Sequence, residues 1–310
     1  MIEYYKQEHG LKPITKWEHG CWIRMTQPTE KELNEMESRF GLPVDLVQDV
    51  RDMDERPRSE LEDGWLMCIV RAPFKVTDEE GGEVTFRTIP LAVLVRDDIH
   101  ITLCYHRAEM LERYIAYSNT KNIEPHIGVD FLLSILMMGG VWYSEYLRQM
   151  NDMMQSTEQQ LEKHLDNEQL KQMMRLEKFL IYFMTSLRDN ELAFERMKRL
   201  IRDLPHDEDL LDDAKVELHQ AYVTASIYSD ILEKQQDGYS SIIDNNLNSI
   251  MKVLTLISVF LMLPTLIAGY LGMNVPNGME EWGGGFMIAI VASVIVCLIS
   301  YVMLKKSKLF

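Results

Sequence analysis

The run VLTLISVFLMLPTLIAGYL, residues 253–271, contains nineteen residues without a charged side chain. A second run, FMIAIVASVIVCLISYVML, covers residues 286–304 and is equally long. About twenty apolar residues in a helix are enough to cross the hydrocarbon core of a bilayer. One such run alone also fits a buried core helix. Two in succession, separated by a glycine-rich turn, favour two membrane crossings.

The charged residues around these runs predict their orientation. Lys252 precedes the first run, and Lys305, Lys306 and Lys308 follow the second. Basic residues gather on the cytoplasmic side of a membrane, so both flanks are expected inside the cell. The start of the chain, MIEYYKQEHG, lacks the basic and apolar segments of a signal peptide. We therefore expect a multi-pass protein of the plasma (inner cell) membrane with both termini in the cytoplasm.

The composition narrows the possible partners. The formal net charge is −16, with 48 acidic against 32 basic residues, and such an excess of negative charge argues against nucleic acid as a partner. The acidity suits simple solubility or contact with divalent cations. The four cysteines are scattered without paired spacing, which is typical of a reducing cytosol and argues against a disulfide frame or a zinc site.

The residues before the first crossing predict a soluble domain followed by long helices. Between residues 19 and 125, short β-rich runs alternate with helical patches, as in an α/β domain. The expected strands are GCWIRM, GWLMCIVRAPF, TIPLAVLV and IHITLCY, and the expected helices are TEKELNEMESRFG and PVDLVQDVRD. Two helical patterns then predict an antiparallel hairpin. A third runs from about Asp209 to Leu271, a helix roughly 95 Å long.

The expected fold class is an α/β cytosolic domain with a long helical stalk and two C-terminal transmembrane helices. The predicted segments are a cytosolic α/β domain (1–128), a cytosolic helical hairpin (129–205), a stalk helix (206–250), a first transmembrane helix (251–271), an extracytoplasmic loop (272–285), a second transmembrane helix (286–304) and a basic cytosolic tail (305–310).

Polar and small residues recur along one side of the long helix. They follow a 4-3-4-3 spacing, which lines one face of a helix in a bundle. This stripe consists of Asp237, Ser241, Asp244, Asn248, Met251, Thr255, Ser258, Met262, Thr265 and Gly269. Polar groups at membrane depth face protein or water. Close helix packing through small residues is one interpretation; a pore built by several copies of the chain is the other.

The segment MKVLTLISVFLMLPTLIAGYLGMN, residues 251–274, resembles the CorA magnesium transporter family, whose signature is Gly-Met-Asn after the first of two C-terminal crossings. The likeness extends to the order of the soluble domain, hairpin, stalk and crossings. It implies a funnel-shaped homopentamer in a lipid bilayer, with five copies of the first crossing around a pore for hydrated Mg²⁺, and with Co²⁺ or Ni²⁺ as further substrates.

The resemblance also implies roles for individual residues. The selectivity filter would be Gly272, Met273 and Asn274. The inner mouth and pore wall would include Asn248, Thr255, Ser258 and Thr265, and the apolar constriction Met251, Leu254 and Met262. Intracellular magnesium bound between neighbouring soluble domains would hold the pore closed, with Asp78, Glu79, Asp212 and Asp213 as candidate ligands. Apart from the resemblance, the stripe itself would place the oxygens of Asp237 and Asp244 at the cytoplasmic mouth, and Glu280 and Glu281 of the outer loop would attract cations outside.

Two departures from the family pattern bear on ion preference. Many members have an aromatic residue directly before the glycine, where this chain has Leu271 after Tyr270. The outer loop, VPNGMEEWGGG, also lacks the usual Met-Pro-Glu-Leu run.

Two other functions are consistent with the same architecture. A zinc exporter of the same superfamily would share the crossings, and a membrane-anchored scaffold would use them only as a tether. No P-loop, paired-histidine site or nucleophile–base pairing is recognisable, so an enzyme is not expected.

Overall fold

The computed structural model describes residues 1–8, 10–77, 84–121, 126–163, 167–273 and 284–306. The chain divides into two compact units, Met1–Lys234 and Gln235–Phe310. The division falls inside one helix, α6 (Glu208–Leu271), which belongs to both units. The unit boundary therefore lies within the segment that the sequence assigned to the stalk.

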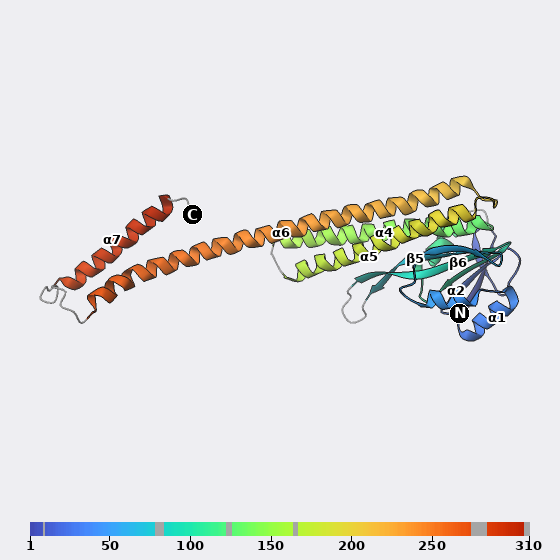
Figure 1. The fold of residues 1–310 in the computed structure, drawn as a ribbon, viewed down its shortest axis with the longest axis horizontal. Helices are drawn as coiled ribbons and strands as arrows, with labels where there is room; N and C mark the ends of the chain where they lie inside the picture. Colours follow the sequence, from blue (N-terminus) through green and yellow to red (C-terminus); the bar gives the residue numbers. More distant parts are fainter. Residues whose placement is uncertain (9, 78–83, 122–125, 164–166, 274–283, 307–310) are drawn as a thin grey trace. The chain divides into compact units, whose positions relative to one another are not determined.

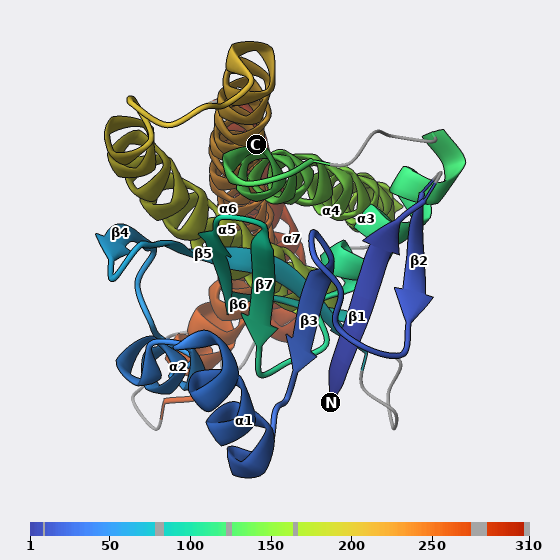
Figure 2. The same ribbon diagram turned by 90° about the vertical axis from the view of Figure 1, so that its right-hand side faces the viewer.

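The first unit is built on one seven-stranded sheet (Figures 1 and 2). Its strands are β1 (Ile2–Gln7), β2 (Leu11–Ile14), β3 (Trp22–Thr26), β4 (Arg58–Glu62), β5 (Trp65–Thr77), β6 (Val84–Arg96) and β7 (Ile99–Cys104). The order across the sheet is β2-β1-β3-β7-β6-β5-β4. Among these described strands, the β3–β7 pair is parallel and the other five pairs are antiparallel. The sheet is therefore mixed.

Helices cover both faces of this sheet. Helices α1 (Glu30–Phe40) and α2 (Val44–Arg51) lie against one face, and α4 (Val129–Lys163) and α5 (Asn167–Leu200) against the other (Figure 2). Every residue of β6 from Thr88 to Val95 is buried as a result. This explains why TIPLAVLV is almost continuously apolar: a strand covered on both faces has no reason to alternate with polar residues.

Helix α1 has the ends that its sequence predicts. The hydroxyl of Thr29 accepts from the backbone N–H of Glu32, and the Glu32 carboxylate accepts from the backbone N–H of Thr29 at 2.8 Å. This reciprocal pair satisfies two amides that have no partner within the helix. Gly41 ends the helix at a φ of 62°, where a side chain would be strained. Its carbonyl accepts from the indole of Trp65 at 3.0 Å, which ties α1 to β5.

A buried polar cluster fastens α4 and α5 to the sheet. The Asn190 side chain accepts from the backbone N–H of Arg71 at 2.8 Å and donates to its carbonyl at 2.9 Å, as a neighbouring strand would. The hydroxyl of Tyr143 donates to the same carbonyl at 2.8 Å. Burial raises the pKa of Tyr143, so this hydroxyl keeps its proton. One backbone position on β5 thus anchors both helices.

Helices α4 and α6 approach each other closely at Gly140. A Cβ atom placed there would lie 2.7 Å from the carbonyl carbon of Glu217 and 2.8 Å from the nitrogen of Leu218. Both neighbours are backbone atoms, which cannot move without shifting α6. Glycine is therefore required at this position by the packing of the two helices.

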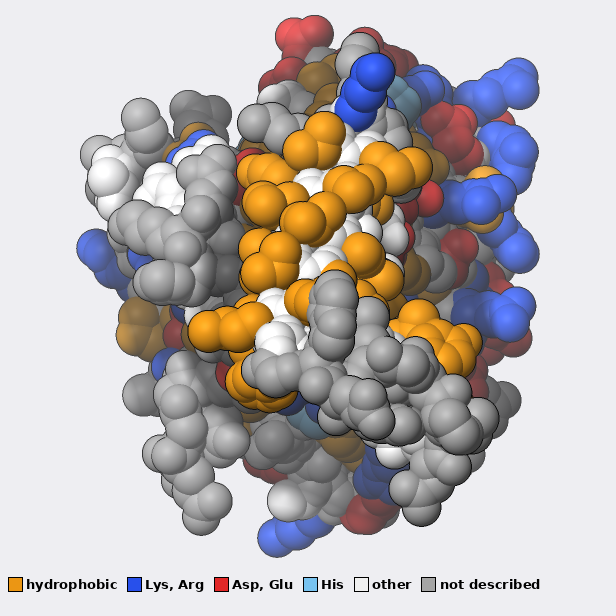
Figure 3. Space-filling model, turned by 90° about the vertical axis from the view of Figure 1, so that its left-hand side faces the viewer, with side chains coloured by type: hydrophobic (Ala, Val, Ile, Leu, Met, Phe, Trp, Pro, Cys, Tyr) orange, Lys and Arg blue, Asp and Glu red, His pale blue; other side chains and the backbone are white. Residues whose placement is uncertain are grey.

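The second unit contains the two apolar helices. The second half of α6 and α7 (Gly285–Lys306) are each long and apolar enough to cross a membrane. None of the most apolar window of either helix is buried, unlike the core helix of a soluble protein. Figure 3 shows hydrophobic side chains gathered in a continuous band on this part of the surface. Exposed side chains of this kind need a lipid or protein environment.

Candidate functional site

The predicted stripe lies on an open face of α6. Thr255, Ser258 and Thr265 are exposed in the single chain, and Met251 and Met262 are 52% and 68% exposed. Leu254, beside the stripe, is 55% exposed. The stripe is therefore available to face water or other copies of the chain.

Helix α7 lies on the other side of α6, across an apolar cavity that residues of both helices line. The half-buried α6 residues at this level include Phe260, Leu263 and Ile267. At 3.6 residues per turn these positions lie opposite Thr255, Met262 and Thr265. The helix thus has two distinct faces, one against α7 and one carrying the polar stripe.

Each hydroxyl of the stripe donates its proton to its own helix. Thr255 Oγ1 donates to the carbonyl of Met251 at 2.8 Å, Ser258 Oγ to Leu254 at 2.9 Å, and Thr265 Oγ1 to Leu261 at 2.7 Å. Ser241 does the same with Asp237 at 3.1 Å. Such i to i−4 bonds are the usual way for serine and threonine to satisfy a donor inside a helix.

These bonds define what the stripe can bind. A hydroxyl has one proton and two lone pairs, so a hydroxyl whose proton is engaged offers its surroundings only acceptors. The waters around a metal cation turn their hydrogens outward and need acceptors. An anion needs donors, which these hydroxyls no longer supply. The stripe therefore suits hydrated cations and disfavours anions.

The acidic residues at the N-terminal end of the stripe are exposed as well. Asp237, Asp244 and Asn248 are exposed on α6. Over the described ranges of the chain, no three Asp, Glu, His or Cys side chains meet as a metal site. These oxygens are thus arranged along one copy of the helix without forming a chelating cluster in it.

Only part of the predicted filter and outer loop is described. Helix α6 ends at Leu271, and the Gly272 N–H donates to the carbonyl of Ala268 at 2.8 Å. Met273 follows with 56% of its surface exposed. Asn274, Glu280 and Glu281 lie outside the described residues.

The proposed regulatory carboxylates are only partly visible too. Asp212 and Asp213 are exposed near the start of α6. Lys215 lies close by; its pKa is raised by its hydrogen bond to Glu195 and, to a smaller extent, by the charge of Asp212. Asp78 and Glu79 are outside the described part of the chain. A metal near Asp212 would have to compete with this lysine.

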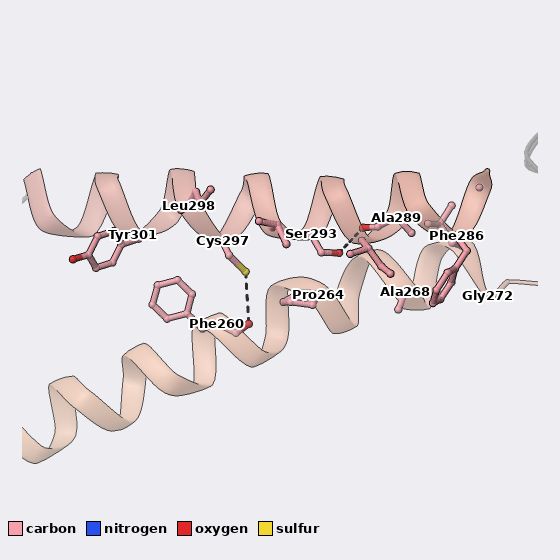
Figure 4. Close-up of a pocket in the computed structure, with 14 residues that line it drawn as sticks. Phe260, Pro264, Ala268, Gly272, Phe286, Ala289, Ser293, Cys297, Leu298 and Tyr301 are labelled. Atoms are coloured by element: carbon pink, nitrogen blue, oxygen red, sulfur yellow. Dashed lines mark hydrogen bonds between the residues drawn. The ribbon is translucent and has the colours of Figure 1, made fainter.

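Pro264 of α6 and Cys297 of α7, which the sequence did not single out, line the same space between the two helices as Phe260. Pro264 lies inside α6, and the thiol of Cys297 on α7 donates to the carbonyl of Phe260 at 3.9 Å (Figure 4). All three line an apolar cavity of about 1030 Å³ between the helices. A proline inside a helix predicts an unpaired carbonyl four residues earlier, so the sequence could have indicated the Phe260 carbonyl. The donor that pairs with this carbonyl depends on where α7 lies and could not be predicted.

Comparison with known proteins assigns the chain. The family model described as CorA-like Mg²⁺ transporter protein matches residues 17–306, nearly the whole sequence. The chain belongs to this family. It is 26% identical to the cobalt/magnesium transport protein CorA of Methanocaldococcus jannaschii over 260 residues, which cover 82% of this chain and 79% of that protein.

Solved structures agree on the fold. The complete structure of the CorA magnesium transporter from Methanocaldococcus jannaschii matches 100% of this chain and 99% of its own length, with a TM-score of 0.83 and 22% identity. The ZntB cytoplasmic domain from Vibrio parahaemolyticus matches 78% of this chain and 98% of its own length, with a TM-score of 0.61 and 14% identity. The CorA fold, with a soluble domain, a long helix and two C-terminal apolar helices, is therefore that of this chain, and the resemblance found in the sequence is confirmed.

Proposed function

We propose that several copies of this chain, five by resemblance to the family, surround one water-filled pore that carries hydrated Mg²⁺ into the cytoplasm. Two crossings cannot enclose a channel, so the passage must lie between copies. The observation that carries the proposal is the line of proton-engaged hydroxyls on the face of α6 opposite α7. Cobalt and nickel ions, which also hold shells of water, would use the same path.

Magnesium fits this kind of passage. It dehydrates reluctantly and is commonly held through its waters. Acceptors that bind those waters by single hydrogen bonds can orient the ion without trapping it. Met251, Leu254 and Met262 would form the apolar neck, which could close by losing its water. The name of the Methanocaldococcus jannaschii relative, a cobalt/magnesium transport protein, supports the choice of ions.

For the gate, we propose that intracellular Mg²⁺ binds between neighbouring soluble units and holds the pore closed. Asp78, Glu79, Asp212 and Asp213 are the candidate ligands. Asp212 and Asp213 are exposed in the single chain, so a neighbouring copy could contribute the remaining ligands. Loss of the ion would leave like charges facing each other and separate the subunits.

Uptake by purified protein in liposomes tests the transport function. We expect Mg²⁺, Co²⁺ and Ni²⁺ to enter down their gradients. Uptake of Zn²⁺ alone, driven by a proton gradient, would instead favour a zinc exporter, an alternative compatible with the fold shared with the ZntB domain. No divalent flux at all would favour a membrane-anchored scaffold.

Asn274→Ala is expected to lower Mg²⁺ uptake about tenfold. The amide of each copy would hydrogen-bond the hydrated ion at the outer mouth, and one lost ring of acceptors costs about 1.4 kcal/mol at the transition state. Uptake into liposomes and rescue of growth in low magnesium both measure the loss. Asn277→Ala, which removes the same amide three residues further along the loop, is the matched control. Normal uptake by Asn274→Ala would remove the selectivity role.

A further inference from the structure

Pro264 leaves a backbone acceptor unpaired in an apolar helix. In a regular α-helix the carbonyl of residue 260 accepts from the N–H of residue 264, but proline has no N–H. Water is absent from the bilayer core, and an unpaired backbone group there costs several kcal/mol. The Phe260 carbonyl therefore needs a donor from elsewhere.

The thiol of Cys297 supplies that donor. Its Sγ lies 3.9 Å from the Phe260 oxygen, and Figure 4 shows the side chain directed from α7 toward this carbonyl. A thiol is a weak donor, but in hydrocarbon the alternative is no hydrogen bond. Cys21, Cys68 and Cys104 differ in being packed in the core of the first unit.

The contact lies beside the proline inside α6. Proline removes one backbone hydrogen bond of the helix, and helices bend at such places. The apolar cavity of about 1030 Å³ beside Phe260, Pro264 and Cys297 leaves room between α6 and α7. Within the single chain, few packing contacts therefore fix the direction of α6 at this level.

A bend at Pro264 would change the alignment of the stripe residues on its two sides. Pro264 lies between Met262 and Thr265, so a change in helix direction there moves Thr265 relative to Ser258 and Thr255. We infer that Cys297 is a positioning residue for transport: by donating to the carbonyl that Pro264 frees, α7 fixes the alignment of the stripe in α6. This inference rests on the proposed pore function of that stripe.

Removing the thiol is expected to slow transport without changing ion recognition. Cys297→Ala and Cys297→Val should each lower the maximal rate of Mg²⁺ uptake about twofold to fivefold. The concentration giving half-maximal uptake should stay the same, because Cys297 faces Phe260 and not the stripe. One variant is smaller than cysteine and one is bulkier, so equal effects indicate the lost donor and opposite effects indicate packing.

A double-mutant cycle with Pro264→Ala isolates the hydrogen bond. In Pro264→Ala the restored N–H pairs with the Phe260 carbonyl, so adding Cys297→Ala should change the uptake rate no further. The infrared S–H stretch of Cys297, obtained by subtracting the spectrum of Cys297→Ala, should lie at lower frequency in the wild type than in Pro264→Ala. Packing alone would not produce that shift.

The two readouts separate the possible failures. An S–H band that Pro264→Ala leaves unmoved, or equal losses of uptake from Cys297→Ala in both backgrounds, would overturn the inference. If the wild type carries no divalent cation, the proposed function fails. In that case the role of Cys297 in transport fails as well. The S–H stretch of Cys297 still shows whether its thiol contacts the Phe260 carbonyl.

Discussion

Replacing Thr255 and Thr265 together by valine is expected to lower Mg²⁺ uptake about a hundredfold. Valine keeps the shape of threonine but removes the oxygen. Each ring of lost acceptors costs about 1.4 kcal/mol, or about tenfold in rate, and the two rings are far enough apart to add. The longer apolar stretch also makes the passage easier to dewet. The measurement is initial uptake into liposomes loaded with a magnesium-sensitive dye.

The matched control for this variant keeps the oxygens. Thr255→Ser with Thr265→Ser retains hydroxyls that can donate to the same carbonyls, Met251 and Leu261. We expect uptake within about threefold of the wild type. If the valine pair transports as well as the serine pair, the hydroxyls do not contact the ion's water and serve helix packing alone.

Gly140→Ala is expected to destabilise the first unit by about 2–3 kcal/mol, the upper range for overpacking. The added methyl group would meet the backbone of Glu217 at 2.7 Å and that of Leu218 at 2.8 Å, so α4 and α6 must separate. Gly139→Ala is the control. Its Cβ would meet only Met110 Sδ at 3.6 Å, an ordinary contact. Gly139→Ala should raise the free energy of unfolding by about 0.5–1 kcal/mol, because alanine favours a helix more than glycine does.

Urea unfolding followed by tryptophan fluorescence can measure both changes in the full chain. Four of the five tryptophans precede residue 235, so the signal reports mainly the first unit. Opposite signs for adjacent glycines are the expected result. If Gly139→Ala lowers the free energy of unfolding as much as Gly140→Ala does, α4 and α6 do not approach each other as described.

The sequence predicts the long helices and buried strands well because their patterns are strong. The third helical pattern was expected from Asp209 to Leu271, and α6 runs from Glu208 to Leu271. The segment TEKELNEMESRFG was expected to form a helix from its first threonine to its closing glycine, and α1 has Thr29 and Gly41 as its caps. Strands β5, β6 and β7 were recognisable because burial makes them apolar.

The elements that were not predicted have weak patterns. Strands β1, β2 and β4 lie toward the two edges of the sheet, and many of their residues are polar and partly exposed. Helix α3 (Glu109–Lys121) was not singled out either. The sheet order could not be read from sequence because the parallel β3–β7 pair joins strands about eighty residues apart.

The candidate site, too, could be predicted from sequence only in part. The spacing from Asp237 to Gly269 predicts a stripe, since one helix face depends only on local periodicity. The position of α7 opposite this stripe, and the contact of Cys297 with the Phe260 carbonyl, depend on tertiary structure that no spacing encodes. The roles of Asn274 and of the regulatory carboxylates remain predictions from family resemblance.

Water access to the stripe tests the central claim most directly. Thr255→Cys and, as control, Ile295→Cys on the side of α7 away from α6 would be treated in liposomes with a charged methanethiosulfonate reagent. The wild type gives the background from its own cysteines. We predict that Thr255→Cys reacts and loses Mg²⁺ uptake as it does so, while Ile295→Cys stays unreacted among the acyl chains. Reaction at Ile295→Cys with none at Thr255→Cys would contradict a water-filled passage along this face of α6.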